Sequence, residues 1–179
     1  AIGLNSGKAG QKVRSIAIGD EAGQSNQGSN SIAIGYQAAW YDQKSENVAI
    51  GNNSQRTGGG NKSVSIGTRT GYSVQRDGAV GVGYEAGRQT QGVGAVAVGE
   101  NAGSYYQGDK SVAIGYRAGH TGVNGFTGSY SVAIGNEAGS TNIPSHAIII
   151  NAQTGPLNTD EFGLYIKPVR LSEQDNNFM

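Results

Sequence analysis

The pentapeptide Ser111-Val112-Ala113-Ile114-Gly115 recurs along the chain at a fixed interval. Identical or closely similar pentapeptides start at Ser15, Ser31, Asn47, Ser63, Ala79, Ala95, Ser131 and Ala147. The starts are 16 residues apart, except that four extra residues precede Ser131. A fixed period of this length is typical of solenoids, in which each repeat forms one turn of a stacked coil.

Within each pentapeptide the second and fourth residues are apolar and β-branched, and the third is small, as in Val112, Ala113 and Ile114. This alternation predicts a short strand with two different faces. The sequence therefore predicts an all-β, parallel β-solenoid of about ten 16-residue rungs. We expect the valine/isoleucine pairs to form a seam up the middle, and the small-residue face to pack against copies of itself in a homo-oligomer.

The fifth residue of the pentapeptide is glycine in every unit from Gly3 to Gly135. Glycine at one fixed place indicates a tight corner or a left-handed backbone conformation. Two variable residues, a small residue and usually a second glycine follow. We expect each rung to contain a strand, a corner, a short second strand and a loop.

The repeats divide the chain into two regions. Residues 1–146 are predicted to form the solenoid, with an insertion loop at about residues 120–130, and residues 147–179 a capping rung and a C-terminal transition segment. Ile149 stands where a small residue is otherwise found, and Phe162–Ile166 is predicted to be a strand. Because the chain opens in the middle of a unit, at Ala1, we expect it to be a piece of a longer array.

Composition argues against several classes of protein. Lys and Arg total 13, Asp and Glu total 13, and the charges are scattered, which does not fit a nucleic-acid interface or a polybasic membrane patch. The chain has no cysteine and no apolar run long enough to cross a membrane. We therefore expect no nucleic-acid partner and no membrane insertion.

The recurring pentapeptide in strict register, followed by a small residue, resembles the head repeats of YadA-like trimeric autotransporter adhesins. This resemblance implies a left-handed β-roll and a homotrimer. The step of 16 residues is longer than that family's usual step, and no neck motif or coiled-coil stalk follows the last rung.

The C-terminal residues resemble a different class of protein. Phe162–Arg170, followed by Asp175–Met179, is similar to the junction at which head repeats of phage and large-DNA-virus fibres precede a cleavable intramolecular chaperone. We therefore expect a non-enzymatic segment of a trimeric viral or phage fibre or spike, which lies on the virion surface and attaches to a host. The alternative is the head of a bacterial trimeric adhesin, at the bacterial cell surface, that binds host surface or matrix.

Enzymatic function is a remote alternative. The hexapeptide acyltransferases are also left-handed β-solenoids, and His120 in the insertion invites the comparison, but their coils have three apolar corners and this repeat has one apolar pair. His120 and His146 are the only histidines, and we expect both in loops or interfaces. The run Gly58–Ser63 does not have the spacing of a phosphate-binding loop. No catalytic residue, metal site or cofactor is predicted.

Two columns of side chains share a place in the repeat. The first is glutamine, which suggests an amide ladder along the stack: Gln11, Gln27, Gln43, Gln75, Gln91 and Gln107. The second is aromatic. Tyr36, Tyr84 and Tyr116 follow the corner glycine, and Trp40, Tyr41, Tyr72, Tyr105 and Tyr106 are expected in the loop after the second strand.

Aromatic rings with a polar tip suit both sugars and proteins. The candidate ligand-binding residues, for a host cell-surface glycan or protein, are Tyr36, Trp40, Tyr41, Tyr84, Tyr105 and Tyr116. The alternative is that these rings pack over neighbouring subunits or shield glycine-rich backbone.

Overall fold

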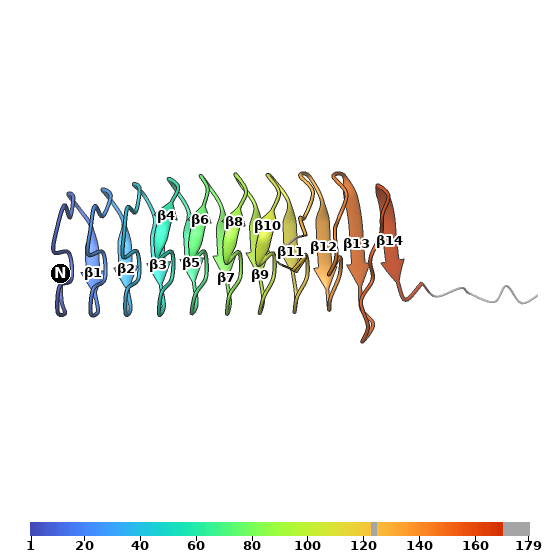
Figure 1. Ribbon diagram of the computed structural model, residues 1–179, viewed down its shortest axis with the longest axis horizontal. Coiled ribbons are helices and arrows are strands. Elements are labelled where there is room, and N and C mark those ends of the chain that lie inside the picture. Colours follow the sequence, from blue (N-terminus) through green and yellow to red (C-terminus); the bar gives the residue numbers. More distant parts are fainter. Residues whose placement is uncertain (123–124, 170–179) are drawn as a thin grey trace, which may run out of the picture.

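The computed structural model describes residues 1–122 and 125–169, which form a single rod of stacked turns with Ala1 at one end (Figure 1). Ten strands pair in parallel in one large sheet, so nine turns lie between the first strand and the last. In order these strands are β1 (Ile16–Ile18), β2 (Ile32–Ile34), β3 (Val48–Ile50), β5 (Val64–Ile66), β7 (Val80–Val82), β9 (Val96–Val98), β11 (Val112–Ile114), β12 (Val132–Gly135), β13 (Ala147–Asn151) and β14 (Gly163–Lys167).

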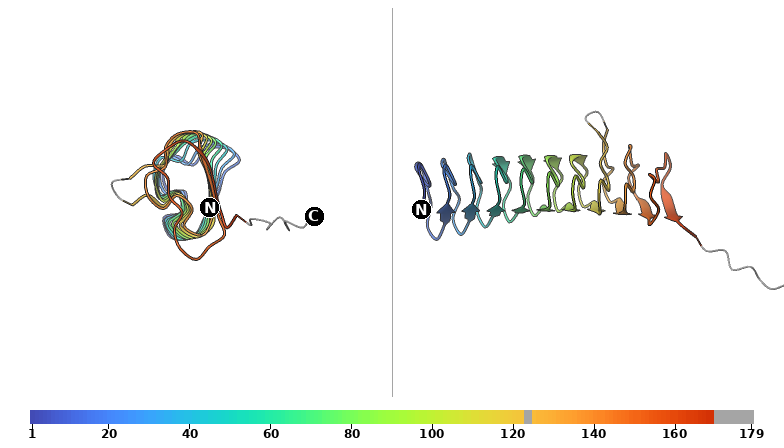
Figure 2. Two further views of the ribbon diagram at one scale, coloured as in Figure 1. Left: turned by 90° about the vertical axis from the view of Figure 1, so that its right-hand side faces the viewer. Right: turned by 90° about the horizontal axis from the view of Figure 1, so that it is seen from below.

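A small second sheet runs along another side of the rod. Its four parallel strands are β4 (Thr57–Gly59), β6 (Ser73–Gln75), β8 (Gln89–Gln91) and β10 (Tyr105–Gln107). In other turns the same place forms only isolated parallel bridges, such as Ser25 with Tyr41. Seen along the rod, successive turns overlie one another (Figure 2). The predicted all-β parallel solenoid is confirmed.

The second strand of a turn lies later in the repeat than we expected. It coincides with the glutamine column, as in β6, and does not follow the corner directly. Tyr105 and Tyr106 therefore lie in β10 rather than in a loop. The corner is followed instead by a turn, because a residue such as Arg69 adopts a left-handed φ of 57° there and ends any extended run.

The valine/isoleucine pairs align in register, as predicted. Val80 pairs with Val96 and Val82 with Val98, and the same pairing continues along the large sheet. The register also survives the insertion, since Val112 pairs with Val132 although the intervening chain is four residues longer than in other turns.

The prediction of which face lies inside was wrong. Ala97 and its counterparts at the third place are fully buried within one chain, whereas Ile16, Ile66 and Ile114 are exposed. In most turns the interior of the coil holds small side chains and an amide, and the branched residues of the pentapeptides lie outside. The alanine face is therefore the core and not an oligomer contact.

The corner glycines have the predicted backbone. Gly99 has a φ of 127°, and a Cβ added to it would lie 2.6 Å from the carbonyl oxygen of Gly115 in the next turn. No L-residue fits both conditions. Non-glycine residues with positive φ recur at further places in the turn, for example at Lys62, Arg69 and Val74.

The buried glutamines form parts of the predicted ladder, and they also tie the two sides of a turn together. Gln75 Nε2 donates to the carbonyl oxygens of Val64 (2.9 Å) and Ala79 (3.2 Å), and to Gln91 Oε1 (3.0 Å). The side chain thus crosses the interior from the small sheet to the large sheet. The Ala79 carbonyl oxygen also accepts from the backbone N–H of Val64 at 2.9 Å, so the amide adds a second hydrogen bond to it.

The core becomes apolar towards the C-terminal end. Ile143 replaces the glutamine, Ile149 points inward from β13, and both are fully buried with Leu157. The strand predicted near residues 162–166 is confirmed as β14, where Tyr165 pairs with Ile149. The division into a solenoid and a transition segment stays a prediction, because β13 and β14 extend the same sheet.

Candidate binding surfaces

The outer face of the large sheet is formed by the second and fourth residues of the pentapeptides. Its exposed members include Ile16 (46% exposed), Ile18 (38%), Ile66 (39%), Ile114 (38%) and Ile134 (37%). Because the register is strict, these side chains and the half-buried valines and isoleucines between them form a continuous apolar column along the rod. Soluble monomers rarely expose an apolar surface of this extent, so the outer face is a candidate protein interface.

Three of the predicted ligand-binding tyrosines form a second, discontinuous row. Tyr36, Tyr84 and Tyr116 each follow a corner glycine, and each is a little under half exposed. They lie on separate turns, so neighbouring strand spacing places Tyr36 and Tyr84 roughly 14 Å apart and Tyr84 and Tyr116 roughly 10 Å apart. The structure therefore leaves these rings accessible but does not bring them together.

Trp40 is engaged by arginine. The guanidinium carbon of Arg56 lies 4.6 Å from the Trp40 ring centroid and 5.5 Å from that of Tyr72, and Arg56 Nη1 donates to the Tyr72 hydroxyl at 3.0 Å. Three successive turns thus stack an indole, a guanidinium and a phenol. Trp40 is half-buried, whereas its neighbour Tyr41 is 51% exposed.

Tyr105 is engaged in a similar way. Arg88 Nη1 donates to its hydroxyl at 3.1 Å, and the His120 ring meets it edge-on with centroids 5.5 Å apart. Burial, followed by the nearby positive charge of Arg117, lowers the pKa of His120 below its usual value of 6.5. For Trp40 and Tyr105 the structure supports packing within the chain, and the binding role of all six aromatic residues stays a prediction.

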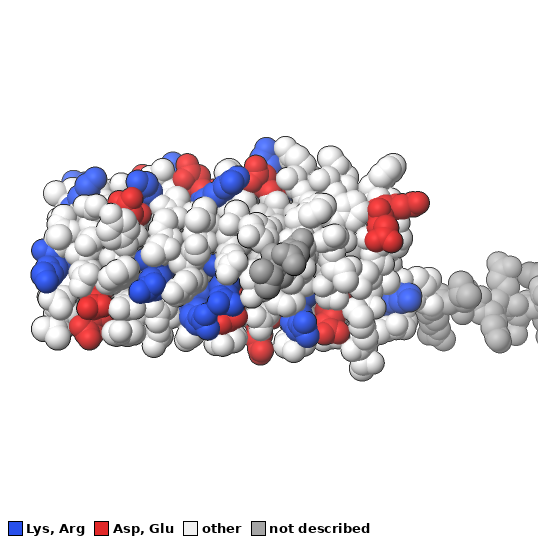
Figure 3. Space-filling view, viewed as in Figure 1, with Lys and Arg blue, Asp and Glu red and all other residues white. Residues whose placement is uncertain are grey.

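Charged side chains of both signs are scattered over the visible face of the rod (Figure 3). Ion pairs join neighbouring turns, including Arg69 with Glu85 (2.8 Å) and Arg117 with Glu137 (3.4 Å). Glu85 also faces Arg88 at 3.4 Å. The visible face carries no surface of a single sign.

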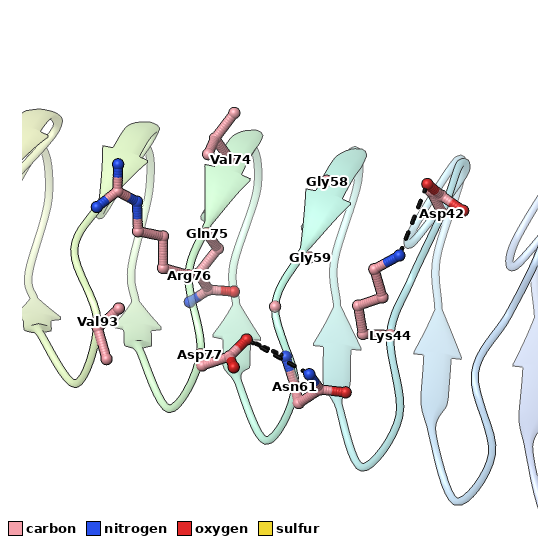
Figure 4. Close-up of a pocket in the computed structure, with 11 residues that line it drawn as sticks. Asp42, Lys44, Gly58, Gly59, Asn61, Val74, Gln75, Arg76, Asp77 and Val93 are labelled. Atoms are coloured by element: carbon pink, nitrogen blue, oxygen red, sulfur yellow. Dashed lines mark hydrogen bonds and ion pairs between the residues drawn. The ribbon is translucent and has the colours of Figure 1, made fainter.

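A cleft of about 410 Å³, here called the Gly58 cleft, opens beside the small sheet (Figure 4). Its floor is the glycine run Gly58–Gly60. Around the floor stand Asp42, Lys44, Asn61, Val74, Arg76, Asp77 and Val93. Lys44 faces Asp42 at 3.9 Å, and Asp77 accepts a hydrogen bond from the backbone N–H of Asn61 at 2.8 Å.

Sequence reasoning missed this cleft, because it tested the glycine run only against the spacing of a phosphate loop. The available signal was positional. Gly58 occupies a place in the repeat where neighbouring turns carry the side chains of Asp42 and Val74. A glycine between two turns that carry a side chain at the same place predicts a hollow there.

The predicted insertion loop is only partly described, since residues 123 and 124 lie outside the described residues. On either side of them the chain projects from the edge of the rod (Figure 2). Thr127 returns to the core, where its Oγ1 donates to the Gly119 carbonyl oxygen at 3.0 Å. Across the ranges 1–122 and 125–169, no group of three His, Asp or Glu side chains could hold a metal ion, and no helix has the length and hydropathy of a membrane span.

Comparison of the sequence with known protein families gives one match. Residues 27–39 and 91–118 match the model of the YadA head domain repeat, in two copies. No curated protein and no solved structure matches the chain. In these two stretches the chain is similar to YadA head repeats, a family of typically non-enzymatic adhesin structure, and the stretches form turns of the β-solenoid.

Proposed function

We propose that this chain is a non-enzymatic, rod-shaped segment of a trimeric surface adhesin. The observation that carries the proposal is the continuous apolar column on the outer face, in a chain whose repeats match those of an adhesin head. A column that runs the whole length of a rod suits lateral association of parallel rods, not the capture of one small ligand.

The outer face, not the alanine face, is the proposed subunit contact. Three copies related by a threefold axis would each bury their column against the other two and close the assembly. Burial of a branched side chain that is exposed in the single chain contributes about 1.5–3 kcal/mol at most. Each turn places two branched residues on this face, most of them half-buried and some exposed, so the contributions of many turns add up to the driving force for association.

The proposed location is an exposed cell surface. The matched repeat belongs to an adhesin head, whereas no comparison supports the phage or viral fibre that the C-terminal residues suggested. We therefore favour the adhesin alternative over a virion spike. Binding to host surface or matrix would use the accessible aromatic residues Tyr36, Tyr41, Tyr84 and Tyr116.

Sedimentation equilibrium tests the assembly. We expect the wild-type protein to sediment as a trimer, and the double variant Ile66→Glu/Ile114→Glu to dissociate, because charges would be buried at the contact. Val13→Glu is the matched control, since Val13 is 67% exposed and lies outside the large sheet. A folded wild-type monomer at micromolar concentration would refute the proposal.

A further inference from the structure

We propose that the Gly58 cleft binds a neutral sugar residue of a surface glycan. This inference rests on the adhesive function proposed above and specifies the chemical class of the partner, a glycan. The cleft itself is formed by one chain and does not depend on the trimer.

The cleft is open because Gly58 lacks a side chain that the fold would accept. Gly58 has a φ of 69°, but the same place in other turns holds Asp42 (61°), Val74 (54°) and Thr90 (49°). A Cβ added to Gly58 would come no closer than 3.7 Å to any atom. In contrast, a Cβ on Gly60 would lie 2.4 Å from the backbone of Arg76, so stacking requires that glycine. Neither the backbone conformation nor the stacking of turns therefore requires glycine at position 58. The consequence of having glycine there is the hollow.

The walls of the cleft match the two kinds of surface on a sugar ring. Val74 and Val93, both exposed, offer apolar contact for the C–H face of a pyranose. Asp42, Asn61 and Asp77 offer oxygens and an amide for hydroxyl groups at the rim. A concave, largely apolar surface with a few convergent polar groups is the usual form of a small-ligand site.

The charges of the cleft favour a neutral ligand. Lys44 is paired with Asp42, and Arg76 directs its guanidinium to Asp109, with Nη1 and Oδ1 3.6 Å apart. Each cation therefore already faces a carboxylate, so an acidic sugar would meet no free positive charge. A neutral sugar can accept hydrogen bonds from Lys44 and donate to Asp77 without a charge left unpaired.

The cleft lies on the side of the rod away from the proposed trimer contact. Gln75 points inward and reaches the backbone of Val64 in the large sheet. Gln75 is buried whereas the neighbouring Val74 and Arg76 are exposed, so these two side chains point outward on the opposite side of the turn from the outer face. Figure 4 shows Val74 directed away from the rod. Trimer formation through the outer face would leave the cleft accessible.

Saturation-transfer-difference NMR on the purified assembly tests the site. The probes are the methyl glycosides of galactose, glucose, mannose and N-acetylglucosamine, with N-acetylneuraminic acid as the charged comparison. We expect at least one neutral glycoside to bind, and Gly58→Asn, which fills the cleft with a residue that tolerates positive φ, to weaken that binding by about tenfold or more. Thr90→Asn, in the same column two turns along, is the matched control and should bind as the wild type does.

A second variant keeps the test decisive if Gly58→Asn does not fold. Val74→Asn exchanges an apolar wall for a polar one at an exposed position and should also weaken binding. Wild-type affinity in both folded variants, no signal from any neutral glycoside, or binding of N-acetylneuraminic acid alone would overturn the proposal. Sedimentation of the same samples reports the trimer separately, so that failure of one proposal is distinguishable from failure of the other.

Discussion

Gln55 and Gly59 exchange the places that glutamine and glycine hold in the next turn, at Gln75 and Gly71. Gly59 leaves the glutamine column empty, and Gln55 enters it from the position where Gly71 stands one turn later. Gln55 Nε2 donates to Gln75 Oε1 at 2.8 Å, and Gln55 Oε1 accepts from Gln43 Nε2 at 3.1 Å. The ladder therefore continues through a turn that lacks the usual residue.

This exchange makes a double-mutant prediction. Gln55→Gly should cost about 1–3 kcal/mol of unfolding free energy, because it leaves a cavity and unpaired amides. Gly59→Gln should cost a similar amount, about 1–3 kcal/mol, since a Cβ at Gly59 would lie 2.6 Å from Gln55 Cδ. The double variant restores the pattern of the adjacent turns and should lie within about 0.5 kcal/mol of wild type. Urea denaturation measures all three, and additive losses in the double variant would contradict the exchange.

At the scale of the strand, the sequence predicted which strands pair and in which register, but not which face of each strand turns inward. Alternation of apolar and small residues predicted the strands, and the fixed step predicted their register. Alternation cannot say which face turns inward, and the usual preference for large apolar residues inside gave the wrong face. The interior is narrow because each turn is short, and a Cβ on Gly103 would already lie 2.6 Å from the Gln107 amide.

A substitution at the alanine position tests this orientation. Ala97 is fully buried, so Ala97→Leu should lower the free energy of unfolding by about 2–4 kcal/mol through overpacking. Val96→Ile is the control, because isoleucine occupies the same place at Ile16 and Ile32. It should change stability by less than about 0.5 kcal/mol. Thermal and urea unfolding give the measurement, and a tolerated Ala97→Leu would mean that the alanine side has free space.

The accessibility of the candidate binding residues follows from the sequence less directly than the fold does. The repeat places Trp40 and Tyr105 at neighbouring positions of a turn, but their burial depends on Arg56 and Arg88 in adjacent turns. Tyr36 and Tyr41 have no such neighbour and are exposed. The place of a residue in the repeat shows where in the turn it lies. The exposure of its side chain depends on the side chains that stand beside it in adjacent turns.

At the scale of the whole molecule, stability is expected to be nearly additive over turns. Deletion of residues 79–94 removes one complete turn and joins Gly78 to Ala95, so every remaining pentapeptide keeps its register. We expect this variant to fold, with a melting temperature within about 5 °C of the wild type. Deletion of residues 79–86 removes half a turn and should prevent the later strands from pairing. Circular dichroism distinguishes the two, and equal loss of structure in both would contradict a modular stack.

The register between β11 and β12 has one more consequence. Their pairing is undisturbed by the four additional residues between them, because the extra chain leaves the rod and returns at Thr127. The pairing of successive strands therefore does not depend on the length of the chain that loops out between them. A peptide epitope grafted between Thr121 and Thr127 would therefore be displayed at a defined height on a rigid support, and in the proposed assembly three copies would be presented on one ring.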